Sequence, residues 1–152
     1  MTDLQQAQFQ GIAPWRDHFA DLGGVQIFRD GFPVTPGHLL FVPEHNDAEH
    51  IVQAFRLAQI KGRDMMDKGE CDGFNVGMNW GRSAGQTVMY PHVHLIPRRT
   101  GDTEDPTGGV RGVIDHQQNY KKPGYKNPTD KYHHSSLSDA HPALKTLRVL
   151  LA

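Results

Sequence analysis

The sequence predicts an α+β fold in which one long helix packs on an antiparallel sheet. Between residues 47 and 68, Ile51, Phe55, Ala58 and Met65 or Met66 recur at helical spacing and form one apolar stripe. Short apolar segments lie on both sides of this helix, and the 16 Gly and 10 Pro of the chain favour short strands joined by many loops. A chain of 152 residues has the usual size of one domain.

The predicted elements follow the order strand, strand, helix, strand, strand, which suggests a meander. Pro33 and Pro36 make a rigid turn between the first two strands, and Asp30 with Gly31 stops the first. Residues 1–14 are polar and Gln-rich and predict a loosely held arm or a short helix. The predicted strands are 25–28, 38–42, 74–79 and a segment near 88–97.

The long helix has clear start and stop signals. Asp47 is a suitable N-cap and Glu49 lies in the first turn, where an acidic side chain is favourable. Gly69 is a natural C-terminal stop after Lys68. We therefore divide the chain into an N-terminal arm (1–14), a domain core (15–100) and a loop-rich C-terminal extension (101–152) with a short helix at 143–151.

Charge and cysteine content exclude several classes of protein. Sixteen Lys and Arg balance seventeen Asp and Glu, so bulk neutralisation of nucleic-acid phosphates has no support. The apolar runs are too short to span a bilayer, and no signal peptide is evident. Cys71 is the single cysteine, which excludes an internal disulfide and a Cys-rich zinc site. We expect a soluble cytoplasmic protein that binds neither nucleic acid nor membrane.

The segment 85–98 holds the densest cluster of polar side chains among apolar neighbours. If it is extended, Tyr90, His92 and His94 project from one face, with the two imidazoles roughly 7 Å apart. Pro91 lacks a ladder donor and is unusual inside a strand, so the strand could instead begin at His92 with Tyr90 in a bulge.

Four interpretations of His92 and His94 compete. Both could be half-buried strand residues without a special role, or a pair of metal ligands. Arg98 and Arg99 follow where a carboxylate ligand would be needed, and they would repel a cation. Nucleic-acid binding is weaker still because the charges balance. Phosphate chemistry is favoured, since His, Gln, Thr and Arg are all donors to anionic oxygen.

Two separated motifs make the sequence resemble the histidine triad superfamily. Its pattern is Gln-x-Val-x-His-x-His-x-His followed by two apolar residues, and the upstream pattern is Pro-x-x-Pro-Gly-His-x-Leu. The matching residues are Pro33, Pro36, Gly37, His38 and Leu40 upstream, then Asn79, Gln86, Val88, His92, His94, Leu95 and Ile96. Tyr90 stands where members have the first histidine, so the triad is incomplete.

The resemblance implies a five-stranded antiparallel sheet with the long helix on one face, and a nucleotide hydrolase or nucleotidyl transferase. His92 corresponds to the nucleophile that forms a covalent nucleotidyl-histidine. The substrates expected from the family are diadenosine polyphosphates or adenylated amines. The alternative is a nucleotide-binding protein with little turnover, in which Tyr90 marks lost catalysis.

The resemblance also implies the site residues, with no metal bound by the protein. Magnesium is expected only with the substrate, and we expect a homodimer. His38 is expected to contact the catalytic residues rather than the substrate. The expected catalytic residues are His92, His94 and Gln86, and the expected nucleotide-binding residues are Phe28, Asp30, Leu40, Asn79, Thr87 and Tyr90.

Overall fold

The computed structural model describes residues 1–128 of the chain. The chain divides into two compact units, Met1–Gln118 and Asn119–Ala152, and all of the described helices and strands belong to the first. The short helix predicted at 143–151 lies outside the described residues. The elements are α1 (Asp3–Phe9), β1 (Ala20–Leu22), β2 (Val25–Arg29), β3 (Leu39–Pro43), α2 (Ala48–Asp67), β4 (Gly73–Gly77), η1 (Arg82–Ala84), β5 (Val93–Arg98), η2 (Gly109–Val113) and η3 (Asp115–Gln117).

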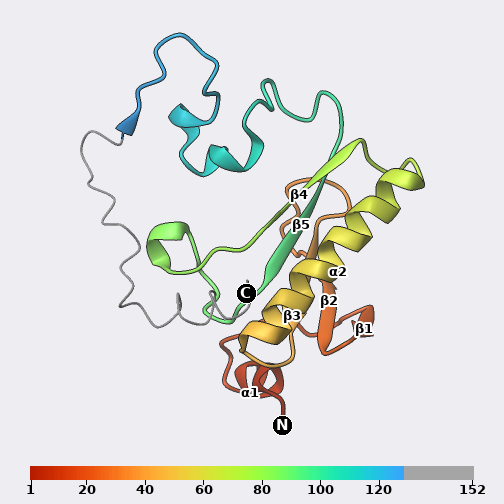
Figure 1. Ribbon diagram of the computed structural model, residues 1–152. Helices are drawn as coiled ribbons and strands as arrows, with labels where there is room; N and C mark the ends of the chain where they lie inside the picture. The colour runs from red at the N-terminus through yellow and green to blue at the C-terminus, as the bar shows by residue number, and fades with distance from the viewer. Residues whose placement is uncertain (129–152) are drawn as a thin grey trace, which may run out of the picture. The chain divides into compact units, whose positions relative to one another are not determined.

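The five strands form one antiparallel sheet in the order β1-β2-β3-β5-β4, with α2 across one face (Figure 1). This confirms the predicted α+β class, but the expected meander is wrong. β5 lies between β3 and β4 and pairs antiparallel with both. After β3 the chain forms α2 on one face of the sheet and then β4, which runs parallel to β3. The strand between β3 and β4 therefore has to run in the opposite direction to both.

Helix α2 begins and ends as its signals predict. The Asp47 side chain accepts a hydrogen bond from the His50 amide, and Lys68 is the C-cap. Gly69 follows with a φ of +72°, a conformation that favours glycine. The described helices contain no segment long and apolar enough to cross a membrane.

The face of α2 that packs on the sheet matches the predicted stripe at Ala58 and Met65 but not at Phe55. Phe55 and Met66 are 37% and 41% exposed. The helix comes so close to β4 that a Cβ on Gly62 would lie 2.6 Å from the Phe74 ring. Small side chains are therefore needed along much of this face, and the buried positions are Ala54, Ala58, Gly62 and Met65.

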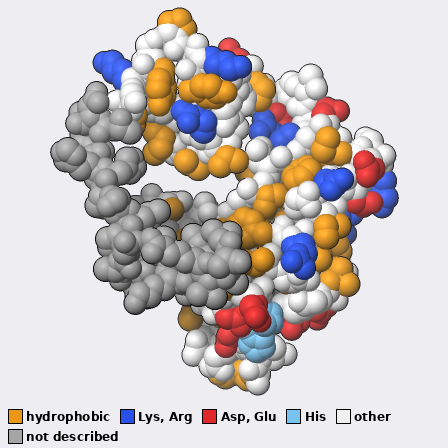
Figure 2. Space-filling view, viewed as in Figure 1, with side chains coloured by type: hydrophobic (Ala, Val, Ile, Leu, Met, Phe, Trp, Pro, Cys, Tyr) orange, Lys and Arg blue, Asp and Glu red, His pale blue; other side chains and the backbone are white. Residues whose placement is uncertain are grey.

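A second core lies away from α2, where the N-terminal helix packs. Leu4 and Ala7 of α1 are buried with Tyr90 and with apolar residues of β2 and β3. The Leu4 amide donates to the Glu44 carbonyl oxygen at 3.0 Å, and Asp3 accepts from the Asn46 amide at 2.8 Å. Figure 2 shows acidic and histidine side chains gathered where α1 meets the start of α2. The N-terminal arm is thus a docked helix.

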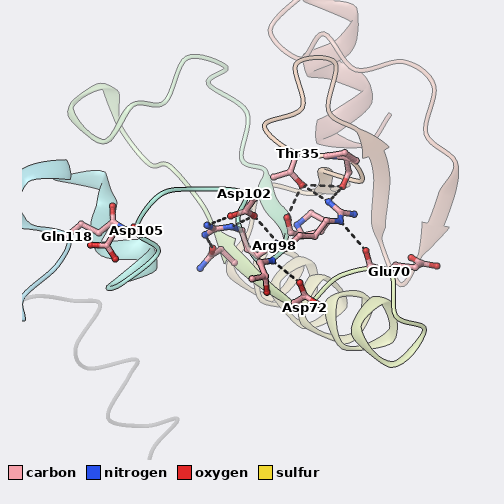
Figure 3. Close-up of polar contacts among 12 residues, drawn as sticks. Thr35, Glu70, Asp72, Arg98, Asp102, Asp105 and Gln118 are labelled. Carbon is pink, nitrogen blue, oxygen red and sulfur yellow. Dashed lines mark hydrogen bonds and ion pairs between the residues drawn. The ribbon is translucent and has the colours of Figure 1, made fainter.

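Arg98 and Arg99 connect the end of β5 to neighbouring segments by hydrogen bonds. Figure 3 shows Arg98 beside Asp102. Arg98 donates to both carboxylate oxygens of Asp102 at 2.8 Å and to Asn75. These bonds hold the pKa of the Asp102 carboxyl well below its ordinary value. Arg99 donates to the Thr35 hydroxyl and to two backbone carbonyls. Both guanidinium groups therefore have structural partners.

Candidate active site

A cavity of about 810 Å³ opens on the side of the sheet opposite α2, a suitable size for a small-molecule ligand. Strands β2 and β3, the segment leading into β5 and the loop after β4 supply most of its walls, and the segment before β1 closes one side. The residues that line it are Pro14, Trp15, Arg16, Asp17, Phe28, Arg29, Asp30, Gly31, Phe32, Val34, His38, Leu40, Asn79, Gly85, Thr87, Val88, His92 and His94.

His92 is held with one ring nitrogen bonded and the other available. It lies just before β5, is 8% exposed, and its Nδ1 is 2.8 Å from the Tyr90 carbonyl oxygen. A carbonyl oxygen only accepts, so Nδ1 carries the proton and donates. In the neutral ring Nε2 then keeps its lone pair, which is the form a nucleophile requires.

A chain of hydrogen bonds sets the tautomer of His94. The Val34 amide donates to His38 Nδ1 at 3.2 Å, so this nitrogen carries no proton. His38 Nε2 therefore carries the proton and donates to His94 Nδ1 at 2.9 Å. His94 Nδ1 is an acceptor, and the proton of the neutral His94 ring is on Nε2. His94 thus offers the cavity an N–H donor.

Asp30 joins this chain from the end of β2. Its Oδ1 accepts from the Phe32 amide at 2.7 Å, which forms the turn after the strand. Its Oδ2 lies 3.3 Å from His38 Nε2 and 4.0 Å from His94 Nδ1. The carboxylate therefore supports the His38 N–H and still lines the cavity.

Asp30, His38 and His94 also have the composition of a metal site, since their ligand atoms lie within 4.8 Å of one another. A cation there would need the lone pair of His38 Nε2. Because His38 Nδ1 accepts from Val34, Nε2 carries a proton and has no free lone pair. The donor set fits a hydrogen-bond chain better than a metal.

Burial keeps the three imidazoles neutral. It lowers the pKa of His92 and of His38, because the charged ring loses its hydration. Burial and the neighbouring His92 and His38 lower the pKa of His94 to about 4. At neutral pH the His92 lone pair is therefore not consumed by a proton.

Most of the residues expected from the sequence meet in this cavity. The structure brings together His92, His94 and His38 with Phe28, Asp30, Leu40, Asn79 and Thr87. The side chains of Gln86 and Tyr90 lie outside the lining.

Gln86 holds the loop that closes the cavity. Its Oε1 accepts from the Gly81 amide at 2.8 Å and its Nε2 donates to the Val88 carbonyl oxygen at 3.1 Å. It is 9% exposed, and both ends of its amide are bonded to backbone. Gln86 therefore shapes the loop that presents Thr87 to the cavity, and its expected catalytic role stays a prediction.

Tyr90 belongs to the second core. It is 4% exposed, packs with Leu4 and Ala7 of α1, and donates its hydroxyl to the Pro43 carbonyl oxygen at 2.5 Å. Tyr90 lies before β5, which begins at Val93, so its side chain does not share a strand face with His94. The first triad position is thus a packing site for α1, and its backbone carbonyl accepts the hydrogen bond from His92 Nδ1.

Trp15 is a cavity residue that the sequence motifs did not indicate. Its ring centroid lies 4.8 Å from that of His92 and 6.1 Å from that of Phe28. The Gln8 amide donates to the Trp15 carbonyl oxygen, and the Arg16 guanidinium donates to the carbonyls of Gln8, Ala13 and Trp15. An aromatic residue after Pro14 at the end of a polar arm was the available signal.

The fold and the paired histidines define a class of protein in which a neutral imidazole, with an unprotonated Nε2, lies in a ligand cavity. A model of the HIT domain matches residues 16–101, more than half of the chain, and the chain therefore belongs to the HIT domain, or histidine triad, superfamily. The matched segment contains the cavity histidines and the motif residues. It begins after α1 and Trp15.

Relatives with known sequences and structures agree with this assignment. An uncharacterised HIT-like protein of Saccharolobus solfataricus is 34% identical over 106 residues, which cover 63% of this chain and 76% of that protein. An AP-4-A phosphorylase of Mycobacterium tuberculosis is 38% identical over 79 residues, 47% of this chain but only 40% of the phosphorylase. The crystal structure of the Plasmodium falciparum diadenosine triphosphate hydrolase in complex with cyclomarin A is 26% identical with a TM-score of 0.51, covering 58% of this chain and 65% of that one.

Proposed function

We propose that this protein is a nucleotide phosphohydrolase that acts through a covalent nucleotidyl-histidine at His92 Nε2. The observation that carries the proposal is the Nδ1–H bond from His92 to the Tyr90 carbonyl, which leaves Nε2 unprotonated in the cavity. Diadenosine polyphosphates and adenylated amines are the candidate substrates.

In the first step, the Nε2 lone pair attacks the α-phosphorus and the bond to the leaving group breaks. The bond from Nδ1 to the carbonyl stabilises the positive charge that develops on the His92 ring. In the second step, water attacks the same phosphorus, the phosphorus–nitrogen bond breaks, and the electron pair returns to Nε2. The nucleoside monophosphate is then released.

Other cavity residues hold the substrate. His94 Nε2–H, the Thr87 hydroxyl and the Asn79 amide are donors suited to phosphoryl oxygens. Asp30 supplies carboxylate oxygens for the ribose hydroxyls, while Phe28 and Leu40 contact the base. These roles need no metal held by the protein, and magnesium enters with a polyphosphate substrate.

The named relatives support the substrate class, since one acts on AP-4-A and another on diadenosine triphosphate by their descriptions. The strands β1 and β4 lie at the two edges of the sheet. Pairing of two copies at such an edge would give the proposed homodimer, and light scattering after size-exclusion chromatography would measure its mass.

The test is His92→Ala, assayed with diadenosine tetraphosphate and with an AMP-binding measurement. Turnover should vanish, while AMP binding changes little because the base and ribose contacts lie on other residues. His116→Ala is the matched control, since the His116 side chain is 79% exposed. Equal turnover by the wild type and the His92→Ala variant would exclude nucleophilic catalysis by His92.

A second candidate function is nucleotide binding with little turnover. It is favoured by one observation, the burial of Tyr90 in the α1 core, which leaves the first triad position without a side chain in the cavity. Tight AMP binding without hydrolysis of any adenine dinucleotide by the wild type would establish this function instead.

A further inference from the structure

The N-terminal part of the chain forms one connected piece that runs from α1 to the wall of the cavity. The Ala13 amide donates to the Ala7 carbonyl oxygen at 3.1 Å, so the turn after α1 folds back on the helix. The Gln8 side chain donates to the Trp15 carbonyl oxygen at 2.8 Å, and Arg16 donates to the Gln8 carbonyl oxygen at 2.9 Å. The position of Trp15 therefore depends on the position of α1.

Docking of α1 holds this piece on the sheet. Leu4 is fully buried in the second core, and its amide donates to the Glu44 carbonyl oxygen at 3.0 Å. The helix has only seven residues, and isolated helices shorter than about 12 residues are marginal in water. Helix α1 is therefore stable only while it is docked. Its docking and undocking form a local equilibrium of the kind that chain ends commonly show.

The far end of the same piece contributes to the cavity, whereas α1 does not. Trp15, Arg16 and Asp17 line the cavity, and the Trp15 ring centroid lies 4.8 Å from that of His92. Leu4 lies outside the lining. Undocking of α1 would thus withdraw Trp15 from a bound ligand, although no part of the helix lines the ligand cavity.

We propose that docking of α1 and occupation of the cavity are coupled, so that Leu4 acts through Trp15 as a positioning residue for the ligand. The inference rests on the proposed function, from which it takes AMP as the ligand. A ligand that contacts Trp15 binds the docked state better than the undocked state, and this difference shifts the docking equilibrium. The factor by which docking tightens AMP binding equals the factor by which bound AMP favours docking. Loss of one aromatic contact sets that factor at about ten.

Hydrogen exchange followed by NMR measures the effect of the ligand on α1. The probe is the Leu4 amide, whose acceptor on Glu44 also lies outside the cavity lining. Without AMP this amide should exchange faster than the amides of the central strand β3, because α1 opens locally. Saturating AMP should slow its exchange about tenfold. The Lys68 amide, which donates to Asp64 at the end of α2, is the control and should exchange at an unchanged rate.

Two variants of α1 measure the effect of docking on the ligand. Leu4→Ala removes a buried side chain and shifts α1 toward the undocked state, which lowers the fraction of molecules that bind AMP well. In calorimetry its AMP affinity should fall, by about tenfold at most, because only the Trp15 contact is lost. Phe9→Ala is the matched control on the same helix and should leave the affinity unchanged, since Phe9 is 82% exposed.

A double-mutant cycle identifies the residue through which Leu4 acts. In the Leu4→Ala/Trp15→Ala variant, the loss of AMP affinity should be about the same as in Trp15→Ala alone, because the contact that docking positions is already absent. Independent effects of the two substitutions would multiply instead. A role of Leu4 in stability alone predicts that multiplication or no loss of affinity at all.

Unchanged exchange of the Leu4 amide at saturating AMP, or multiplying effects in the cycle, would overturn this inference and leave the proposed hydrolase intact. If Leu4→Ala does not fold, hydrogen exchange in the wild type still decides the question. Absence of AMP binding to the wild type would instead contradict the proposed function, and the inference with it. Calorimetry on the wild type therefore separates the two failures.

Discussion

The buried phenol of Tyr90 allows a direct test of whether the altered triad position takes part in catalysis. Tyr90→Phe keeps the ring in the α1 core and removes only the hydrogen bond to the Pro43 carbonyl. Leaving this acceptor unpaired costs about 1.5 kcal/mol of unfolding free energy. In a chain of 152 residues this lowers Tm by about 3–6 °C.

Tyr90→His should be worse, although it restores the histidine of the family pattern. An imidazole fills less of the space against Leu4 and Ala7 and buries a polar nitrogen there. We expect a loss of about 3 kcal/mol and a fall in Tm of about 6–12 °C. Turnover per folded molecule should not rise, because the new ring would lie in the core.

Calorimetric unfolding and anhydride hydrolysis, measured on the same samples, check both variants. His116→Ala is the control, since the His116 side chain is 79% exposed. A tenfold loss of turnover in Tyr90→Phe with an unchanged Tm would refute the structural role and place the phenol in the chemistry. A faster Tyr90→His would refute it as well.

Three further predictions concern the cavity. Trp15→Ala should weaken AMP binding about tenfold, a typical loss for one aromatic contact. Trp80→Phe, at a residue that is 60% exposed, should leave it unchanged. Equal affinities of the wild type and Trp15→Ala for AMP in calorimetry would show that Trp15 does not contact the ligand. Asp30→Asn keeps the acceptor for the Phe32 amide and should still weaken AMP binding by about 1–2 kcal/mol; unchanged affinity would make Asp30 only a turn residue. Since burial lowers the pKa of His92, anhydride hydrolysis should stay constant as pH falls to the ordinary histidine pKa and decline only below it as Nε2 is protonated; a decline beginning above that value would contradict the assignment.

The long helix and the central strands could be predicted because their signals are local. Asp47 and Gly69 mark the ends of α2 by their own hydrogen bonding and backbone conformation. The packing face was harder to predict, because the need for a residue as small as Gly62 comes from the close approach of Phe74 on β4. Periodicity records which positions share a face but not how closely the partner approaches.

The candidate site shows the same division. His92 and His94 stand out by spacing, but the tautomer of His94 depends on Val34 and His38, which are far away in the sequence. Gln86 matches the motif, yet its bonds to Gly81 and Val88 place it in the loop rather than the cavity. Trp15 was missed because only the docking of α1 brings it beside His92.

The hydrogen-bond chain that ends at His94 begins with a backbone amide as its first donor. This affects how readily the tautomer of His94 can be changed by mutation. Val34 is 67% exposed, while its N–H donates to His38 Nδ1. Every amino acid except proline carries that N–H. Most substitutions at position 34 would therefore leave the His94 tautomer unchanged. The tautomer depends on the backbone conformation of the turn and not on which side chain residue 34 carries.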